Sequence, residues 1–362
     1  MTSVHPADDM RIFAKECRTL AARGYDVHLI APGAQPGLRE GVCVWAVPAG
    51  KSSSRALRIT RTVMHVYRFA RGLDADVYHL HDPELIPAGL LLAQRGKQII
   101  YDAHEDLPDD ILMKAWIRPR LRPPIARLAA VVEPAAARRF AAVVAATPTI
   151  QERFAGQRCR AVTVGNFPDL AEFDGPPPAD RDHERAVCYV GGITDVRGVR
   201  VMVEAMAHVD AALLLAGRFS PRGLRDQLVA LPGWSRVVEL GHTERAEVAR
   251  IFRRSRAGLV LFKPTAAHLT ARPTKIYEYM AAGLPVIASD FPRWRAVLED
   301  AGCGLCVDPG DPGALARAIK WILDHPQEAK AMGEKGRRAV ESRYNWQSEA
   351  RTLEALYEAV LA

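Results

Sequence analysis

The sequence predicts an α/β protein made of two doubly wound domains that face each other across a cleft. The chain has 362 residues, which is enough for about two domains. Short apolar runs alternate with amphipathic segments along almost the whole chain, a pattern typical of parallel sheets covered by helices on both faces. Between the two halves, residues 166–184 contain four prolines and six acidic residues, as expected of a stiff, polar linker.

Each strand is expected where an apolar run lies between turn residues. In the first half these runs are residues 25–31, 42–47, 77–80, 98–101, 142–145 and 161–164, and in the second half they are residues 186–190, 212–216, 237–240, 258–261, 285–288 and 304–307. Helical patterns lie between them. In residues 10–23, for example, Asp8 or Asp9 can cap the start of a helix and Gly24 can end it.

The expected domain boundaries follow from this alternation. Residues 1–166 form an N-terminal domain, residues 167–185 a linker, and residues 186–343 a C-terminal domain. Residues 344–362 form a helix that we expect to pack back on the N-terminal domain. Residues 1–5 are too few for a complete first strand, so we expect the natural start of the protein to lie upstream of Met1.

The composition excludes fibrous, disordered and membrane-spanning proteins, because 49% of the residues are hydrophobic, 25% are charged and no tract is of low complexity. The longest apolar run, residues 85–93, falls well short of the roughly 20 residues of a membrane span. No signal peptide opens the chain, which indicates a cytoplasmic protein. Six scattered cysteines, of which only Cys303 and Cys306 are close in sequence, favour simple packing over a metal or redox site.

The net charge of +7 belongs entirely to the first half. Up to Gly165 there are 23 basic and 16 acidic residues, and from Asn166 onward there are 26 of each. Residues 51–71 hold six basic residues and no acidic one, and residues 114–139 hold seven basic residues and one acidic one. This imbalance indicates an acidic partner. No nucleic-acid-binding module is recognisable, so we expect no nucleic acid partner.

The two basic clusters could each face a membrane. On a helix spanning residues 55–71, one face carries Arg58, Arg61, His65 and Arg68. The second cluster mixes Lys114, Arg118, Arg120, Arg122 and Arg127 with Trp116, Ile117 and Leu121, as expected of a segment resting on an anionic membrane surface. A solvated helix face is the alternative. The hypothesis is a peripheral protein at the inner membrane face.

Ligands of parallel α/β sheets bind at the carboxyl ends of the strands. In the first half this rule selects residues 79–82 and 102–105, and in the second half residues 191–192, 217–218, 241–243, 263–275 and 289–290. The histidines and acids in residues 79–82, together with His104 and Glu105, could ligate zinc or iron if three or four of them converged. We favour a polar substrate-binding cluster and expect no metal.

Two segments of the second half can hold an anion and a sugar. Gly191 and Gly192 follow an apolar strand and open a helix, so backbone N–H groups and Arg197 could hold a diphosphate, although a plain tight turn fits equally well. This turn lacks the Gly-x-Gly-x-x-Gly and P-loop spacings, which counts against a dehydrogenase or an ATPase. In residues 272–287 a short helix presents Lys275 to an anion, and Glu278 can accept hydrogen bonds from sugar hydroxyls.

With these segments in place, the chain resembles the retaining glycosyltransferases of family 4, which have the two-domain GT-B fold. The most specific part is residues 278–287, Glu-Tyr-Met-Ala-Ala-Gly-Leu-Pro-Val-Ile. The supporting parts are residues 2–6 with Asp9, Arg11 and Ile12, and residues 81–85, 101–105, 191–198 and 344–346.

The resemblance implies that the C-terminal domain binds a nucleoside diphosphate sugar, UDP- or GDP-linked. The N-terminal domain would bind a glycan, lipid-linked or small-molecule acceptor. The catalytic residues would be His104, Arg197 and Lys275. The donor-binding residues would be Gly191, Gly192, Arg197, His242, Thr243, Thr270, Lys275 and Glu278, and the acceptor-binding residues Asp9, Arg11, His81, Asp82 and Glu105. Neither a metal nor a cofactor is implied.

The expected activity is therefore a metal-independent, hexosyltransferase-type transfer of a sugar to an acceptor hydroxyl with retention of configuration. One position departs from the family pattern: Thr270 stands where family members have a glutamate that reaches the donor sugar. Two alternatives remain. A sugar-nucleotide 2-epimerase of the same fold would need no acceptor, and a non-catalytic sugar-nucleotide-binding subunit would bind the donor without turnover.

Overall fold

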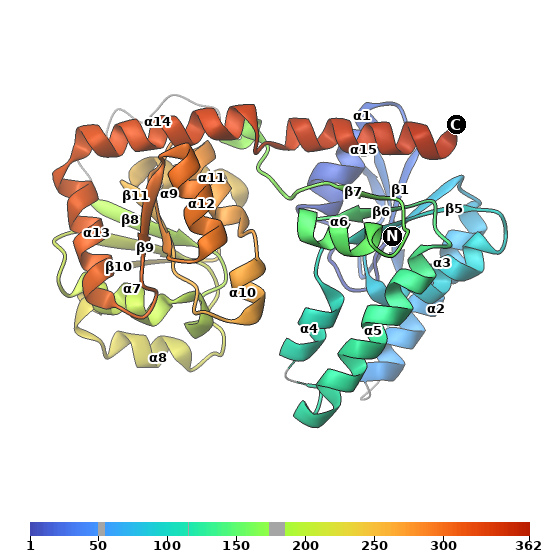
Figure 1. The fold of residues 1–362 in the computed structure, drawn as a ribbon, viewed down its shortest axis with the longest axis horizontal. Helices are drawn as coiled ribbons and strands as arrows, with labels where there is room; N and C mark the ends of the chain where they lie inside the picture. Colours follow the sequence, from blue (N-terminus) through green and yellow to red (C-terminus); the bar gives the residue numbers. More distant parts are fainter. Residues whose placement is uncertain (50–54, 115, 174–184) are drawn as a thin grey trace. The chain divides into compact units, whose positions relative to one another are not determined.

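The computed structural model describes residues 1–49, 55–114, 116–173 and 185–362, so most of the expected linker, residues 174–184, lies outside the described residues. The chain forms two compact units (Figure 1). Unit 1 comprises Met1–Asn166 and Trp346–Ala362, and unit 2 comprises Phe167–Asn345. Within the described parts of the chain, no helix combines the length and the apolarity needed to cross a membrane.

Unit 1 contains two sheets where the sequence predicted a single parallel one. The first has the order β1-β3-β2 and the second the order β4-β5-β6-β7. Their strands are β1 (Val27–Pro32), β2 (Gly37–Arg39), β3 (Val42–Val47), β4 (Val77–Leu80), β5 (Gln98–Ala103), β6 (Ala142–Ala145) and β7 (Ala161–Thr163). The short β2 was not predicted, and it pairs antiparallel with β3, whereas the other pairs are parallel.

The backbone of Met1 and Thr2 lies between the two sheets. The Thr2 N–H donates to the carbonyl of Ile30 in β1 (3.0 Å), and the His81 N–H donates to the carbonyl of Met1 (3.2 Å). The Met1 amino group donates to the carbonyl of His79 in β4 (2.6 Å). These two residues therefore connect β1 to β4 although neither belongs to an assigned strand.

Helices cover the sheets of unit 1. They are the π-helix η1 (Ile12–Cys17) and the helices α1 (Arg18–Ala22), α2 (Arg55–Leu73), α3 (Ile86–Ala93), α4 (Leu107–Met113), α5 (Arg122–Ala137), α6 (Pro148–Ala155) and α15 (Trp346–Leu361), with 3-10 turns η2 (Pro83–Leu85) and η3 (Pro119–Leu121). The segment predicted as one helix over residues 10–23 thus starts as a π-helix. Asp9 caps it, because its Oδ1 accepts from the N–H groups of Arg11 (2.9 Å) and Ile12 (3.0 Å).

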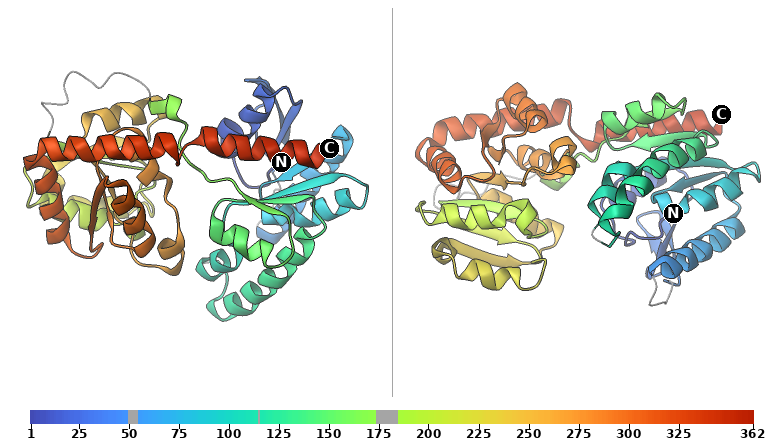
Figure 2. Two further views of the ribbon diagram at one scale, coloured as in Figure 1. Left: turned by 45° about the horizontal axis from the view of Figure 1, so that its top comes forward. Right: turned by 60° about the horizontal axis from the view of Figure 1, so that its bottom comes forward.

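The last helix, α15, packs in unit 1 against η1 and β7 (Figure 2). Its inward side chains recur at intervals of three and four residues, as an amphipathic helix requires: Trp346, Ala350, Leu353, Leu356, Tyr357 and Val360. Leu353 joins a core cluster with Ile100 and Val144 of the sheet. The Trp346 indole N–H also donates to Thr19 Oγ1 (2.9 Å).

Unit 2 holds a six-stranded, fully parallel sheet in the order β10-β9-β8-β11-β12-β13. The strands are β8 (Ala186–Val190), β9 (Ala212–Ala216), β10 (Val237–Gly241), β11 (Ala257–Val260), β12 (Val286–Ser289) and β13 (Gly304–Val307). The helices are α7 (Val199–Met206), α8 (Leu224–Val229), α9 (Arg245–Arg254), α10 (Ala266–Thr270), α11 (Thr274–Ala281), α12 (Pro292–Ala301), α13 (Pro312–Asp324) and α14 (Pro326–Ser342), with 3-10 turns η4 (Leu170–Phe173), η5 (Asp195–Arg197) and η6 (Pro232–Arg236).

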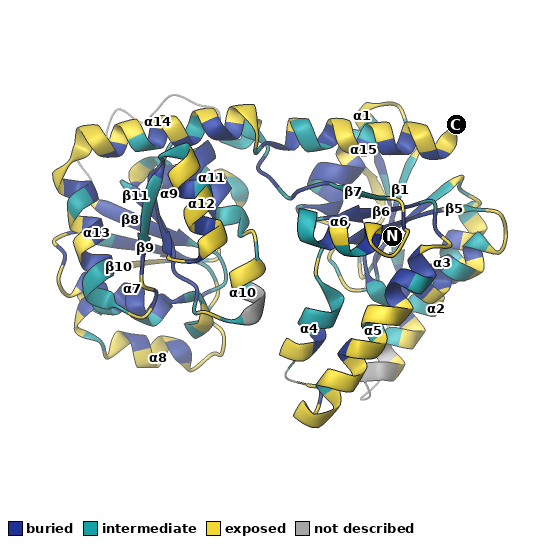
Figure 3. Cartoon of the chain, in the orientation of Figure 1, coloured by how far each residue is buried: buried dark blue, intermediate teal, exposed yellow. Residues whose placement is uncertain are grey.

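Two apolar cores fill the space between this sheet and its helices, and the helices turn their exposed faces outward (Figure 3). Cys303 is buried in one of these cores, and burial raises the pKa of its thiol to about 12. Both observations fit the packing role expected from the sequence.

Replacing Leu353 by Ala tests whether α15 is an integral part of unit 1. Leu353 is fully buried, so Leu353→Ala is expected to destabilise unit 1 by about 2–5 kcal/mol, the usual loss for a large-to-small change in a core. Leu361→Ala, on the same helix at a 43% exposed position, is the control and should cost less than about 0.5 kcal/mol. Urea unfolding followed by hydrogen exchange in β6 measures both, and equal losses would contradict the packing of α15.

Candidate functional site

The sheet of unit 2 reverses its strand order between β8 and β11, because β9 and β10 follow β8 on one side while β11 lies on its other side. Such a switch point leaves a crevice at the carboxyl ends of the two strands, where α/β proteins bind ligands. The Gly191–Gly192 turn follows β8 at this point.

Two basic side chains lie directly on these glycines. A Cβ atom at Gly191 would overlap the Cε and Nζ atoms of Lys275, and a Cβ atom at Gly192 would lie 2.9 Å from an Arg197 terminal nitrogen. Gly191 also has a φ of +138°, which side-chain-bearing residues rarely adopt. The two glycines thus leave the space in which Lys275 and Arg197 approach the backbone.

The charge at this turn is strongly positive. Burial lowers the pKa of Lys275, Glu278 opposes this shift, and Arg197 and Arg245 add to it because they repel a further positive charge. Lys275 lies in the first turn of α11, where unpaired N–H groups add a partial positive charge. A cation crowded by other cations and partly removed from water is expected to gain from a bound anion.

Glu278 of α11 contacts polar side chains from other elements of unit 2. Its Oε1 accepts from an Arg245 terminal nitrogen (2.8 Å), and Arg245 Nε also donates to Glu172 (2.9 Å). Arg245 opens α9, directly after the 241–243 turn. The sequence analysis missed Arg245 and Glu172 because 73 residues separate them and 33 separate Arg245 from Glu278, so no local pattern connects them.

The remaining predicted donor residues, His242, Thr243 and Thr270, lie on two other segments of unit 2. His242 is exposed and Thr243 is half-buried in the turn after β10. Thr270 is exposed at the end of α10, and its carbonyl accepts from Arg293 (3.3 Å). Their contribution to donor binding stays a prediction.

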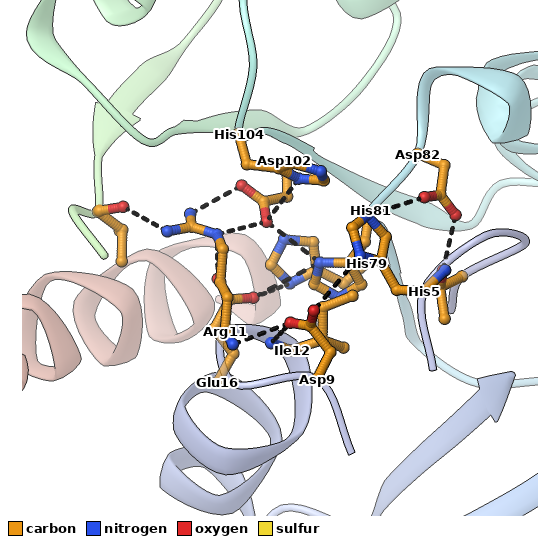
Figure 4. A network of polar contacts seen from close by, with 12 residues as sticks. His5, Asp9, Arg11, Ile12, Glu16, His79, His81, Asp82, Asp102 and His104 are labelled. Carbon is orange, nitrogen blue, oxygen red and sulfur yellow. Dashed lines mark hydrogen bonds and ion pairs between the residues drawn. The ribbon is translucent and has the colours of Figure 1, made fainter. Parts of the chain in front are cut away.

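In unit 1 a buried polar network lies at the ends of β4 and β5 (Figure 4). At its centre, the Arg11 guanidinium binds both oxygens of Asp102 (2.8 Å each) and donates to the carbonyl of Val164 (2.9 Å). Arg11 and Asp102 are 6% and 1% exposed. Burial raises the pKa of Asp102, but Arg11 together with hydrogen bonds from His104 and His81 more than compensates, and the pKa ends well below its usual value. Arg11 is therefore fixed inside unit 1.

Glu16 is a member of this network that the sequence analysis did not select. Its Oε1 lies 3.1 Å from Arg11 Nε, and neither of its buried oxygens has a hydrogen-bond partner among the described residues. The π-helix explains the contact, because the Glu16 N–H bonds the carbonyl of Arg11 five residues earlier and brings the two side chains together. In an α-helix, residues five apart do not share a face.

His79 and His81 stack on each other beside Glu16, with ring centroids 4.5 Å apart. His81 Nδ1 lies 3.2 Å from Asp102 Oδ2, and burial lowers the pKa of His81 to about 4. Ligand atoms of Glu16, His79, His81 and Asp102 lie within 4.8 Å of one another, close enough for a metal ion. However, the Arg11 guanidinium already binds both oxygens of Asp102 and contacts Glu16, so this set is a poor fit to a cation.

A more accessible group of side chains lies at the edge of the network. His104 Nδ1 is 3.6 Å from Asp102 Oδ2; burial lowers the pKa of His104, but Asp102 more than compensates and the pKa is raised. His5 packs edge-on against His104 (5.0 Å between centroids) and contacts Asp9 (3.3 Å). Glu105 is exposed next to His104.

Asp82 is a buried neighbour of His5 at this edge. It is 2% exposed, accepts hydrogen bonds from Thr2 and Ser3, and lies 3.4 Å from His5 Nε2. Among the residues predicted to bind the acceptor, Arg11, His81 and Asp82 are thus buried with internal partners. Asp9, His104 and Glu105 have surface that a ligand can reach. Direct contact of any of them with an acceptor stays a prediction.

Solved structures share the fold of the whole chain. A sucrose-phosphate synthase from Thermosynechococcus elongatus has a TM-score of 0.74 and 22% identity, covering 95% of this chain and 91% of that one. Anabaena HepE in complex with UDP-glucose has a TM-score of 0.71 and 15% identity, covering 95% of both chains. The fold is therefore GT-B, with two Rossmann-like domains, as predicted.

Family comparisons then define the class of enzyme. Residues 11–166 match the model described as a glycosyl transferase 4-like domain, and residues 173–339 match that of glycosyl transferases group 1. The chain belongs to the GT4-type glycosyltransferases. Curated relatives include an MMP α-(1→4)-mannosyltransferase of Mycolicibacterium hassiacum (24% identity, covering 90% of this chain and 79% of the relative) and a phosphatidyl-myo-inositol mannosyltransferase of Mycolicibacterium smegmatis (26%, 93% and 86%).

The buried Glu16 makes the stability of unit 1 depend on pH. Burial raises the pKa of Glu16 from 4.5 to about 8, with Asp102 adding to the shift and Arg11 opposing it. The folded chain then holds a proton that the unfolded chain has released, so stability falls as pH rises from about 4.5 to about 8, by up to about 1.4 kcal/mol per pH unit. Glu16→Gln should remove this slope and gain stability over the wild type as pH rises.

Urea unfolding at pH 5, 6, 7 and 8 measures this difference. Glu358→Gln, at an exposed position on α15, is the matched control and should keep the wild-type slope. Parallel curves for Glu16→Gln and the wild type would show that Glu16 is ionised throughout this range.

Proposed function

We propose that this glycosyltransferase moves a hexosyl group from a nucleoside diphosphate sugar, UDP- or GDP-linked, to an acceptor hydroxyl with retention of configuration and without a metal ion. Unit 2 would bind the donor, and unit 1 would bind the acceptor. The observation that carries the proposal is the placement of Lys275 and Arg197 on the Gly191–Gly192 turn. A diphosphate bound there would meet two cations and the N-terminus of α11.

The chemistry of the leaving group explains why these cations would matter. As the bond between the sugar and the diphosphate breaks, negative charge grows on the diphosphate oxygens. Lys275 and Arg197 lie against the backbone of Gly191 and Gly192, where a Cβ atom would clash with them. The two cations are therefore already in place, and little reorganisation is needed to stabilise that charge. This role is the one a divalent ion has in metal-dependent transferases, which is why we propose a metal-independent reaction.

The donor's ribose would lie against Glu278. A carboxylate accepts two hydrogen bonds from neighbouring hydroxyls, and Arg245 holds the Glu278 carboxylate in place from its other side. The turn containing His242 and Thr243, which directly precedes Glu244 and Arg245, would contact the base. The solved HepE complexes with UDP and UDP-glucose, which share the fold, support a nucleotide sugar as donor.

For the acceptor, we propose the edge formed by His5, Asp9 and His104. Hydrogen bonds to His5 and two backbone N–H groups outweigh burial and lower the pKa of Asp9 to about 2, so that carboxylate stays ionised and can accept a hydrogen bond from a hydroxyl. Retention follows if the acceptor oxygen attacks on the same face of the sugar that the diphosphate leaves. One relative is named as an MMP α-(1→4)-mannosyltransferase and another as a phosphatidyl-myo-inositol mannosyltransferase, and these names support our proposal of a glycan or lipid-linked acceptor.

The test is a donor and acceptor screen in the presence of EDTA. The purified chain is incubated with UDP-, GDP-, ADP- and dTDP-sugars and with glycan, lipid-linked and small-molecule acceptors, and NMR determines the anomeric configuration of the product. An α-linked product from an α-linked donor in EDTA is expected. Loss of activity in EDTA with rescue by metal would contradict metal independence.

The same screen separates the alternatives. A changed sugar nucleotide formed without acceptor would identify a 2-epimerase. Tight binding of a nucleotide sugar without turnover on any acceptor would favour a non-catalytic subunit, in line with Thr270 at the family's glutamate position.

Glu278→Gln is expected to weaken binding of the nucleoside diphosphate by about 1.5–3 kcal/mol, because it replaces a charged acceptor of hydrogen bonds by a neutral one. Arg245→Ala, which keeps the carboxylate but removes its support, should cause a smaller loss. Calorimetry measures both, with Glu328→Gln at an exposed position as control. Unchanged affinity in a folded Glu278→Gln protein would remove Glu278 from the ribose site.

Lys275→Ala and Arg197→Ala are expected to reduce turnover more than donor binding, because the diphosphate carries more charge in the transition state than in the bound donor. We expect kcat to fall by about 10²–10³-fold and the Kd for the donor to rise by only about tenfold. Lys320→Ala, at an exposed position of α13, is the control. Equal losses in kcat and Kd would indicate ground-state anchoring only.

A further inference from the structure

The α4–α5 hairpin, residues 107–137, has a small core of its own. Ile111 of α4 packs with Ile117 and Ala126, and these three side chains are at most 8% exposed. Figure 1 shows α4 and the start of α5 projecting from the rest of unit 1. Few side chains of the hairpin are therefore buried in its own core, and many of the others face outward.

The outward side chains are unusually apolar. Among the described residues, eight of the eighteen exposed large hydrophobic side chains lie between residues 112 and 132: Leu112, Met113, Trp116, Leu121, Ile125, Leu128, Val131 and Val132. Leu128 and Val131 are the most exposed, at 63% and 69%. Single exposed apolar residues are normal on any surface, whereas a contiguous patch indicates a binding surface.

These side chains form a stripe along α5. Leu121, Ile125, Leu128 and Val132 follow one another at intervals of four, three and four residues, and Val131 widens the stripe to about a third of the helix circumference. The buried side of α5 carries other residues: Ala126 in the hairpin's own core, and Ala136 and Ala137 in a core cluster of unit 1. The stripe therefore faces away from the core of unit 1 (Figure 3).

Exposed positive charge borders the stripe. Arg118, Arg120 and Arg127 are exposed, whereas Lys114 pairs with Asp110 (2.7 Å) and Arg122 donates to the carbonyl of Ile117 (2.9 Å). The sole carboxylate in residues 116–139 is Glu133, which is 2% exposed and bound to Tyr101 and Arg153. The outer face of α5 is therefore apolar and positive without a competing acid.

The first basic cluster is less suited to a membrane than the sequence indicated. On α2, Arg61 and Arg68 are exposed, but His65 Nδ1 lies 2.9 Å from the carbonyl of Pro48, so His65 is not part of a free basic face. The side chain of Arg58 and residues 51–54 lie outside the described residues. The α4–α5 hairpin is the stronger candidate.

We propose that the α4–α5 hairpin docks on the surface of an anionic lipid bilayer, with the apolar stripe of α5 inserted at the boundary of headgroups and acyl chains and with Arg118, Arg120 and Arg127 at the lipid phosphates. The positive charge beside the stripe favours an anionic lipid surface over a second copy of this chain. A symmetric pairing with a second copy through the same stripe would bring the same arginines together, whereas anionic lipid neutralises them while its acyl region accepts the apolar side chains.

The position of the hairpin relates docking to the proposed acceptor. α4 begins three residues after His104, at the accessible edge of the polar network of unit 1. If the proposed function holds, a lipid-linked acceptor could reach this edge with its lipid still in the bilayer. Docking itself does not require catalysis, so the two can fail separately.

The test measures binding of the full chain to vesicles, either phosphatidylcholine alone or with 30% phosphatidylglycerol, by sedimentation at low and high salt. The variants are Leu128→Gln with Val131→Gln, and Arg118→Gln with Arg120→Gln and Arg127→Gln. Their controls make the same changes on unit 2, at the exposed Val229 and Val238 and at the exposed Arg222, Arg250 and Arg317. The arginine control removes the same net charge.

The wild type is expected to bind the anionic vesicles preferentially. The arginine variant should lose up to about a hundredfold in the partition coefficient at low salt, since each basic residue near such a surface contributes about fivefold, and the Leu128 and Val131 variant should lose about tenfold at both salt concentrations. Both controls should bind like the wild type. Calorimetry with the nucleoside diphosphate that the donor screen selects, in the absence of vesicles, should give the same affinity for all variants.

Three results would overturn the proposal. The wild type could bind neutral and anionic vesicles equally, the unit 2 controls could lose as much binding as the hairpin variants, or the chain could self-associate through α5, with Leu128→Gln and Val131→Gln converting a dimer into a monomer in sedimentation equilibrium. Failure of docking with intact donor binding leaves the proposed function standing.

Discussion

The forked ion pair between Arg11 and Asp102 is the contact on which unit 1 depends. It joins the start of the first helix to the end of β5, and the third contact of Arg11, with the carbonyl of Val164, reaches the end of β7. Removal of either residue alone would leave the other as a buried charge without its partner, which would cost several kcal/mol of stability. The orientation of His81 and His104 in turn depends on Asp102, because both rings direct Nδ1 toward its Oδ2.

Unit 2 places its buried cations differently. Arg11 lies between the Asp102 carboxylate and the Glu16 carboxyl group, whereas Lys275 lies among Arg197, Arg245 and a single Glu278 carboxylate, which Arg245 already binds. Positive charge at the switch point of the sheet is therefore only partly compensated. Such a site costs stability until an anion neutralises it, a common trade-off at functional sites.

The sequence was sufficient where local patterns determine structure. Strands β3, β4, β6, β8, β9 and β13 begin and end at the predicted residues, because each is an apolar run between polar or glycine turns. β2 was not predicted, because a three-residue, partly exposed strand has no hydrophobic signature. Glu16 was not predicted, because its contact with Arg11 needs a π-helix. Arg245 was not predicted, because its partners are distant in sequence. Of the predicted site residues, His81, His104, Gly191 and His242 lie at the carboxyl ends of strands, where topology alone places them.

The two units differ in electrostatics in the way that the proposed transfer requires. At the edge of unit 1, Asp9 is ionised with a pKa of about 2, and the pKa of His5 is raised chiefly by its hydrogen bond to Asp9, with burial opposing the shift. Acids and histidines there contact one another and can exchange hydrogen bonds with hydroxyls. At the turn of unit 2 the cations have too few acids to neutralise them. Hydroxyl groups, which are neutral, suit the first environment, and phosphates suit the second, so an exchange of the two ligands between the units would leave charge unpaired on both.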